Sequence, residues 1–309
     1  MSSALQGLIW ALLFVSLEAV QFVYLGNLFQ RVDSFAFGAW VFGLSTVGFV
    51  GFAWWFRRDQ LRKALAQPML LFWINLTAVL AWIAYLGSVQ RIEPSVAYTI
   101  GSGVMPLATY GLWLLGVAGG ERLRNRAEMV GNLFILIALI YLFAVTLLGH
   151  SGFVRGGTQG ATEGLVLAVA DGVFFVWLLI LCKRLDILGI GAAVIFGLRM
   201  PLYVAVAGVG ALTPMAMRSA TSLVDWVWII LLGLMLIIPP LYALQRAVGL
   251  SSMLTISALT ALGPFLIFAL QMLEDRVDYS WPTLIGLGLY FFGALTAAFG
   301  AVRGARASD

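Results

Sequence analysis

Charged residues are scarce in this chain. They make up 10% of the 309 residues, whereas hydrophobic residues make up 62% and the mean hydropathy is +1.00. A typical soluble domain carries roughly 25% charged residues, so a soluble fold could not hide this much apolar surface. The composition therefore excludes an ordinary soluble protein and indicates an all-α protein whose solvent is largely lipid.

Cysteine and histidine occur once each. Cys182 alone cannot form an intramolecular disulfide, and we expect its thiol to be a packing group. His150 alone cannot build a cluster of histidine metal ligands. The chain also lacks a Gly-Lys-Ser/Thr loop that would cradle phosphates. We therefore expect no metal, no other cofactor and no direct use of ATP.

Apolar windows of about 20 residues recur along the whole chain. The first of them is too long for a cleaved secretory signal and is expected to remain as a membrane helix. The windows predict ten transmembrane helices near residues 5–29, 34–56, 68–89, 95–119, 128–148, 163–183, 188–211, 225–247, 251–273 and 281–302.

Positive charge in the loops provides a test of this count, because cytoplasmic loops retain Lys and Arg. Of the 18 Lys and Arg, 12 lie in one set of alternate loops and five in the other, while Arg199 falls inside the seventh predicted helix. This pattern predicts a multi-pass plasma-membrane protein, a bacterial inner membrane being favoured, with both termini in the cytoplasm. The scattered charges form no basic patch, so we expect a small-molecule substrate and membrane lipid as partners, and no nucleic acid.

The chain contains an internal repeat. The dipeptide Gln-Arg at residues 90–91 recurs at residues 245–246, each time between the third and fourth helices of a group of five. Because five is an odd number, two tandem copies enter the membrane from opposite faces, which is typical of transporters with inverted repeats. We therefore predict two inverted five-helix repeats, residues 1–150 and 151–309.

The repeated stretch resembles the drug/metabolite transporter superfamily, specifically the EamA-type ten-helix exporters. The likeness rests on "YLGSVQRIEPSVAYTIGSGVMP", followed by "GGERL" and Gly131, and on "LYALQRAVGLSSMLTISALTALGP", followed by "LEDRV" and Gly286. Glu121 and Glu274 match the acidic residue that follows the fourth and ninth helices in that family. The first helix departs from it, with "FVSLEAVQF" in place of a Trp-Gly/Ser-Ser/Thr signature. The resemblance implies alternating-access export of small metabolites, often amino acids.

Two prolines lie near the centres of the fourth and ninth predicted helices. Pro106 and Pro264 each remove a backbone hydrogen bond, and such interruptions are the best sequence sign of a transport site. Polar residues on the same helices, including Tyr98, Ser102 and Thr260, recur at helical spacing. They suit either a cavity wall or hydrogen bonding between packed helices.

Three ionisable residues lie well inside predicted helices. Glu18 and Asp171 are expected about 12 Å below the outer boundary, and Arg199 near the midplane. A buried charge is costly, so these residues are expected to pair, to face a cavity or to titrate. One alternative is a structural pair between Arg199 and a carboxylate. Another is a zwitterion site with both signs of charge, and a carboxyl that holds a proton would also allow proton coupling.

Other polar and aromatic side chains complete the predicted site. The expected substrate-binding residues are Glu18, Gln21, Asn75, Trp82, Tyr98, Ser102, Pro106, Asp171, Arg199, Tyr203, Thr260 and Pro264. We expect a secondary transporter and not an enzyme. The alternative hypothesis is a membrane-embedded enzyme that acts on lipid or a lipid-linked substrate, using His150 with Asp171 or Glu163.

Overall fold

The chain folds as a bundle of helices. The computed structural model describes residues 3–29, 31–116, 120, 123, 125–213, 222–250, 259–273 and 277–306. Within these residues no strand forms, and Ile92 and Val154 make an isolated antiparallel bridge. The helices are α1 (Ser3–Leu28), α2 (Ser34–Phe56), α3 (Arg58–Leu65), α4 (Pro68–Arg91), α5 (Pro94–Leu114), α6 (Arg126–Leu147), α7 (Gly157–Ile187), α8 (Ala192–Leu198), α9 (Pro201–Ala211), α10 (Leu223–Leu250), α12 (Gly263–Gln271) and α13 (Trp281–Arg306).

Eight helical segments are long and apolar enough to cross a membrane. They are Gln6–Leu28, Ser34–Phe56, Pro68–Arg91, Arg126–Leu147, Gly157–Ile187, Ala192–Ala211, Val224–Leu244 and Trp281–Ala301. Large apolar side chains are exposed on them, for example Val47 (72%), Met235 (71%) and Phe292 (65%). Exposed apolar surface on this scale suits contact with lipid. The chain is therefore an all-helical membrane protein.

The eight segments coincide with eight of the ten predicted helices. The other two predictions, 95–119 and 251–273, correspond to α5 and to a region whose described part includes α12. Neither is among the eight, so the count of ten stays a prediction. Glu121 and Glu274, which matched the family pattern, lie outside the described residues.

The structure adds two features within the predicted helices and loops. The seventh predicted helix is broken into α8 and α9 at Arg199 and Met200, immediately before Pro201. The loop after α2 contains the short helix α3, which buries Leu61 and Ala64 and leaves its charged residues outside. The sequence prediction missed both features.

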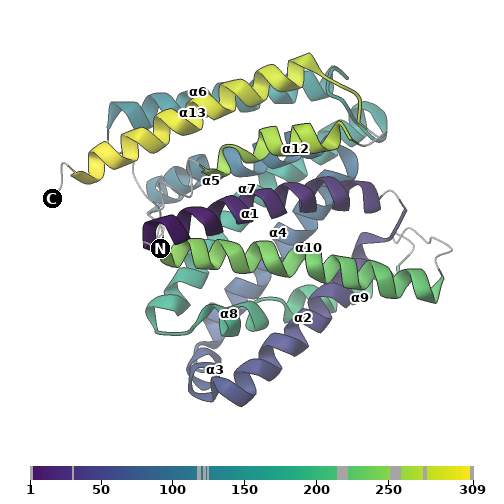
Figure 1. Cartoon of the computed structure of the whole chain (residues 1–309), viewed down its shortest axis with the longest axis vertical. Helices are drawn as coiled ribbons and strands as arrows, with labels where there is room; N and C mark the ends of the chain where they lie inside the picture. The colour runs from purple at the N-terminus through teal and green to yellow at the C-terminus, as the bar shows by residue number, and fades with distance from the viewer. Residues whose placement is uncertain are drawn as a thin grey trace.

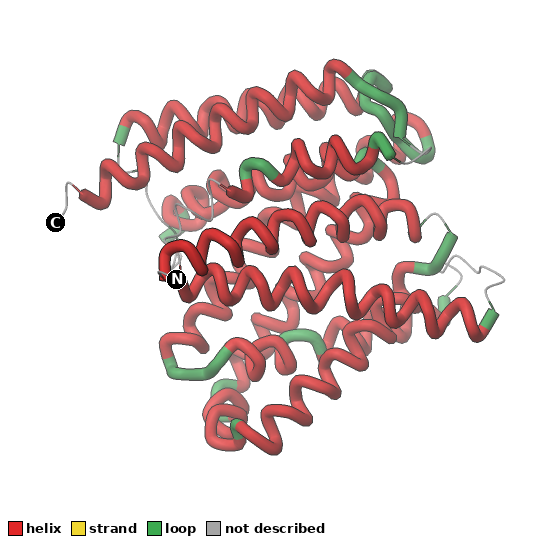
Figure 2. Tube along the Cα trace, in the orientation of Figure 1, coloured by secondary structure: helices red, strands yellow, loops and turns green. Residues whose placement is uncertain are grey.

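The connections gather at two ends of the bundle, as the loops in Figure 2 show. At one end Gln90 donates a hydrogen bond to the Phe29 carbonyl (2.9 Å), and Arg155 N–H donates to the Arg91 carbonyl (2.8 Å). At the other end Gln60 of α3 accepts a bond from Gly191 N–H (2.9 Å). The first end joins loops of the arginine-poor set, and the second joins loops of the arginine-rich set. The predicted alternation of the loops therefore holds at these contacts.

Helices from the two halves of the chain lie side by side. Figure 1 shows α6 and α13 along one edge, α1 beside α10 in the middle, and α2 near α8 and α9 at the other edge. Helix α7 packs against α4 and α5, and α12 packs against α1 and α5. Helices α1, α5, α7 and α12 therefore meet in the interior of the bundle.

Glycines set the separation of α6 and α13. A Cβ atom on Gly131 would lie 2.2 Å from the backbone nitrogen of Ala297, and one on Gly293 would lie 2.8 Å from that of Ile135. A Cβ atom on Gly286 would lie 2.4 Å from a methyl carbon of Leu142. Small residues let membrane helices approach closely, and here they bring two backbones into contact.

Gly131→Ala is expected to destabilise the protein by about 1–3 kcal/mol, because the added methyl group meets backbone that cannot rotate away. The measurement is the thermal unfolding temperature in detergent. Gly288→Ala on α13 is the matched control, since a Cβ there has no neighbour within 4 Å. Equal unfolding temperatures for the two variants would contradict the prediction.

Candidate functional site

A carboxyl group from α1 meets a tyrosine from α5 inside the bundle. The Tyr98 hydroxyl donates a hydrogen bond to Glu18 Oε2 at 2.9 Å, and the Thr260 carbonyl oxygen lies 3.5 Å from the same hydroxyl. Gly263 leaves room for this ring, because a Cβ atom there would lie 2.6 Å from the Tyr98 hydroxyl oxygen. Three predicted site residues thus come together where α1, α5 and the segment before α12 meet.

Asp171 of α7 belongs to the same cluster. A Cβ atom on Gly101, one turn after Tyr98 on α5, would lie 3.1 Å from Asp171 Oδ2. A Cβ atom on Gly172 would lie 2.3 Å from the Gly101 carbonyl oxygen, so glycines on both helices allow the close crossing. Glu18 and Asp171 are near enough to interact electrostatically. We call Glu18, Tyr98 and Asp171 the central carboxyl cluster.

The central carboxyl cluster is only partly accessible. Tyr98 is buried, whereas Glu18 and Asp171 are neither fully buried nor exposed. Next to it Gln21 donates a hydrogen bond to the Tyr85 hydroxyl (3.2 Å), and the Phe22 ring packs against the rings of Tyr85 and Tyr98. The cluster therefore offers two carboxyl groups to a small partner in a surround of aromatic side chains.

Polar side chains on one face of α5, Tyr98, Ser102 and Thr109, make hydrogen bonds within the helix as well as at the site. Ser102 Oγ donates to the Tyr98 carbonyl, and Thr109 Oγ1 donates to the Met105 carbonyl at 2.9 Å. Ser102 also contacts the Tyr290 hydroxyl on α13. Ser102 thus joins α5 to α13 beside the cluster, in keeping with the interhelical alternative.

A second group of predicted residues lies where α4 approaches α9. Asn75 Nδ2 donates to the Leu198 carbonyl (2.7 Å), and its Oδ1 accepts from Leu202 N–H (3.1 Å). These are backbone groups on either side of the break between α8 and α9. Asn75 is therefore a backbone-capping residue that fixes the break.

Aromatic rings connect this second group to the central carboxyl cluster. Consecutive ring pairs have centroids 4.5 to 5.4 Å apart. In order, the chain of rings is Tyr203, Phe42, Trp82, Tyr85, Phe22 and Tyr98. The Tyr203 hydroxyl fits against Gly38 of α2, where a Cβ atom would lie 2.2 Å from it. Trp82 and Tyr203 are thus packed core residues between the two groups.

Arg199 pairs with neither carboxyl group. Its guanidinium contacts the Cys182 thiol and lies 4.6 Å from the centre of the Phe196 ring. Cys182 follows Asp171 by 11 residues on α7, which is about 16 Å along the helix axis. That exceeds the reach of an arginine side chain, and Glu18 lies at the level of Asp171. The alternative of a structural Arg-carboxylate pair is therefore wrong, and one site with both signs of charge does not form.

The two central prolines have different effects. Helix α5 continues through Pro106, which lies inside it. Pro264 stands in the first turn of α12, after a turn at residues 261–262 that separates it from the helical residues 259–260. The predicted interruption is confirmed at Pro264, whereas α5 absorbs Pro106 without ending. The break that was not predicted precedes Pro201.

Glu93 is a buried acidic residue that the sequence reasoning missed. It lies between α4 and α5, is 0% exposed, and accepts hydrogen bonds from Gly152 N–H (2.8 Å), Thr283 Oγ1 (2.9 Å), Ser95 Oγ (2.7 Å) and Gln271 Nε2. Burial raises the pKa of its carboxyl above the ordinary value. The signal available in the sequence was an acidic residue at a helix start, directly before a proline.

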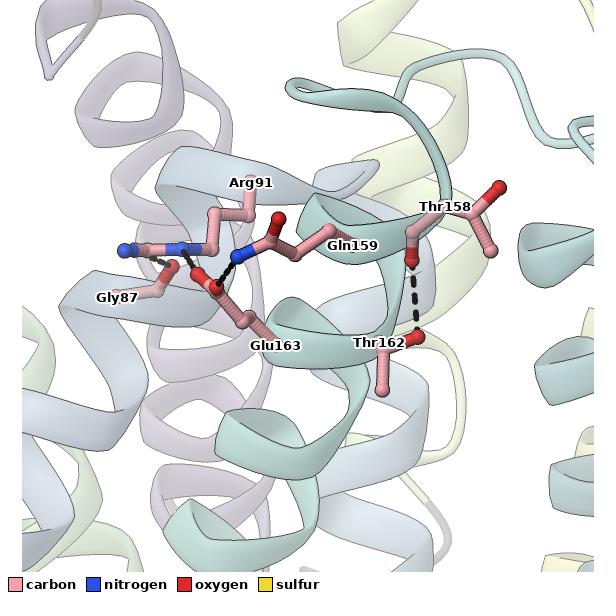
Figure 3. Close-up of polar contacts among 6 residues, drawn as sticks. All are labelled: Gly87, Arg91, Thr158, Gln159, Thr162 and Glu163. Atoms are coloured by element: carbon pink, nitrogen blue, oxygen red, sulfur yellow. Dashed lines mark hydrogen bonds and ion pairs between the residues drawn. The ribbon is translucent and has the colours of Figure 1, made fainter.

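The charged pair at the same end of the bundle is exposed. Arg91 Nε lies 2.9 Å from Glu163 Oε2, and Gln159 Nε2 donates to Glu163 Oε1 at 3.0 Å (Figure 3). The alternative hypothesis of an enzyme required Glu163 or Asp171 beside His150. In the structure Glu163 contacts Arg91 and Gln159, and Asp171 lies about 21 Å along α7 from its first residue, so the enzyme alternative stays a hypothesis.

Comparison with known proteins informs the fold alone. No family model matches the chain, and no curated protein matches it. A solved structure described only as "Crystal structure of protein" aligns over 99% of this chain and 99% of its own, with a TM-score of 0.62 and 19% sequence identity. At this identity the likeness shows a shared fold alone.

Proposed function

We propose that the protein is a secondary active transporter that exports small metabolites, amino acids among them. It works by alternating access between two inverted halves, residues 1–150 and 151–309, as the resemblance to EamA-type members of the drug/metabolite transporter superfamily implies. In this proposal the protein lies in the plasma membrane, with the bacterial inner membrane favoured, and both of its termini are in the cytoplasm.

The pattern of helix packing carries this proposal. If the two halves are exchanged, each helix of the first half has a counterpart in the second. The counterparts are α1 and α7, α2 and α8 with α9, α4 and α10, α5 and α12, and α6 and α13. The packing of α1 on α10 then corresponds to that of α7 on α4, the packing of α1 on α12 to that of α7 on α5, and the packing of α2 on α10 to that of α9 on α4. The pairs α2 with α9, α5 with α12, and α6 with α13 map onto themselves. A two-fold relation between the halves accounts for all these pairs together.

The central carboxyl cluster supports the same reading. Glu18 and Tyr98 come from the first half, and Asp171 comes from the second. Two carboxyl groups close together in a poorly hydrated interior repel each other when both are charged, so they suit a bound cation, an ammonium group or a proton. Coupling of export to protons is therefore part of the proposal.

The ends of the chain fit this topology. Helix α1 begins and α13 ends at the same end of the bundle (Figure 1), which requires an even number of crossings. Most Lys and Arg lie in the loops expected at that end, which the positive-inside rule assigns to the cytoplasm.

The test is export by the purified full chain in proteoliposomes loaded with radiolabelled amino acids and related metabolites, with and without a pH gradient. We expect protein-dependent efflux of a subset of these solutes, faster when protons can enter in exchange. Efflux equal to that of protein-free vesicles for every solute would refute the proposal. Turnover of added lipid would favour the enzyme alternative.

A further inference from the structure

The break between α8 and α9 brings an arginine into the bundle. Helix α8 ends at Leu198, and α9 starts at Pro201. Proline suits the first position of a helix, because the backbone N–H that it lacks would have no partner within the helix there. Asn75 binds the Leu198 carbonyl and the Leu202 N–H, so the break is held by a dedicated side chain. Arg199 is therefore presented at a fixed position, next to the positive end of the α9 helix dipole.

The Arg199 side chain is buried with an unsatisfied donor. It is 9% exposed, and its Nε has no hydrogen-bond partner among the described residues. Its neighbours are the Cys182 thiol and the face of Phe196, neither of which carries a negative charge that neutralises a guanidinium. An ion pair that the described residues form, Arg91 with Glu163, lies at the bundle end.

A buried charge without a counter-ion is costly in a membrane and usually marks a ligand site. The carboxyl groups that might have neutralised Arg199 are about 16 Å away along α7. The counter-ion of Arg199 is therefore expected to be a bound ligand and not one of the described side chains. A guanidinium presents a planar fork of donors that matches the two oxygens of a carboxylate.

We propose that Arg199 binds the carboxylate of a small organic acid or amino acid, in a site separate from the central carboxyl cluster. Phe196 offers an apolar face beside the charge, which favours a carboxylate attached to a hydrophobic or aromatic body. This inference rests on the proposed transport function for its physiological meaning. In transport terms, Arg199 selects the anionic group of the substrate, and Glu18 and Asp171 hold a proton at a separate position.

Cys182 is a built-in reporter, because it is the only cysteine of the chain and touches Arg199. The experiment is alkylation of the reconstituted full chain by N-ethylmaleimide, timed with and without benzoate, benzylamine or benzyl alcohol. These three probes share a phenyl ring and differ in charge. We expect benzoate to slow the reaction at least threefold, and the other two to leave it nearly unchanged.

Two variants tie the protection to the guanidinium. Arg199→Gln is expected to abolish protection by benzoate, and Arg199→Lys to retain part of it, since the charge remains and the fork is lost. Both variants should elute as the native protein does in size-exclusion chromatography, which separates loss of binding from loss of folding. If Arg199→Gln fails this check, the Arg199→Lys result decides.

Three outcomes would overturn the proposal. The first is undiminished protection by benzoate in Arg199→Gln, or in Arg199→Lys when that variant decides. The second is equal protection by all three probes. The third is a Cys182 thiol that benzoate does not protect, or that does not react with N-ethylmaleimide at all. Alkylation reports binding without transport, so the outcome is independent of the efflux assay. Efflux without benzoate protection would refute the anion site alone, and benzoate protection without efflux of any solute would refute the transport function alone.

Discussion

Glu18→Gln is expected to lower the initial rate of export by about 10- to 100-fold. The substitution keeps the size of the side chain and an oxygen that can accept from Tyr98, but it removes the charge and the titratable proton of the carboxyl group, whose Oε2 accepts from Tyr98 at 2.9 Å. Hydrogen bonds to charged groups contribute about 1.5–3 kcal/mol, which corresponds to this range of rates if the carboxyl group acts in the rate-limiting step. The measurement is efflux from proteoliposomes at a fixed pH gradient. Asp171→Asn should give a loss of similar size.

The same helix supplies a matched control for Asp171. Glu163 also lies on α7, but its side chain is 45% exposed and its ion pair with Arg91 is at the bundle end. Exposed pairs contribute little, so Glu163→Gln should export at the native rate. The export rate of Tyr98→Phe should fall between those of Asp171→Asn and Glu163→Gln, because this variant loses the hydrogen bond to Glu18 and keeps both carboxyl groups. If Glu163→Gln lost as much activity as Asp171→Asn, the central carboxyl cluster would have no special role.

Glu93→Ala is expected to destabilise the protein by about 3 kcal/mol or more, since an unsatisfied buried polar group costs roughly 1–3 kcal/mol. The carboxyl group accepts from four donors, and its partners Gly152, Gln271 and Thr283 lie far from it in sequence. Its loss should therefore separate α12 and α13 from the start of α5. Thermal unfolding in detergent measures the effect. Asp278→Ala at the same end is the control, since its backbone N–H makes the bond to the Gly152 carbonyl and is retained.

The stability contributed by Glu93 should also depend on pH. Burial raises the pKa of Glu93 above its ordinary value of 4.5, so the folded protein holds this proton more tightly than the unfolded chain does. The contribution is then fully present below the unfolded pKa and is lost as pH rises through the folded pKa. Relative to Glu93→Gln, which does not titrate, the native protein should lose stability as pH rises above about 4.5, by at most about 1.4 kcal/mol per pH unit. A gain in stability would mean that the four donors outweigh burial.

Most helices could be predicted because the length and apolar composition of a membrane helix are visible in the sequence. The segments Ser34–Phe56 and Trp281–Ala301 agree with the predictions 34–56 and 281–302 within one residue. The short helix α3 was missed because its charged residues are typical of a loop. The break at Arg199 was missed because apolar residues continue on both sides of it, and only the Met-Pro dipeptide at residues 200–201 marked it.

The site was predictable in part for a similar reason. Glu18 and Asp171 stand out because a charge inside an apolar run is costly, and the structure places them near each other. Their partners do not stand out in this way. Tyr85 and Tyr290 are ordinary aromatic residues in sequence, and only the approach of α4 and α13 makes them neighbours of Gln21 and Ser102.

The sequence by itself determined the solvent, the type of secondary structure and most of the helix boundaries, because these depend on composition and on local runs of apolar residues. It also singled out Glu18, Asp171 and Arg199 inside the predicted helices, but not the buried Glu93. Only the tertiary structure decided which charges meet, since that depends on which helices lie side by side and at what height. It placed Asp171 with Glu18 and placed Arg199 beside Cys182, about 16 Å further along α7, and an arginine side chain cannot span that distance to form the pair.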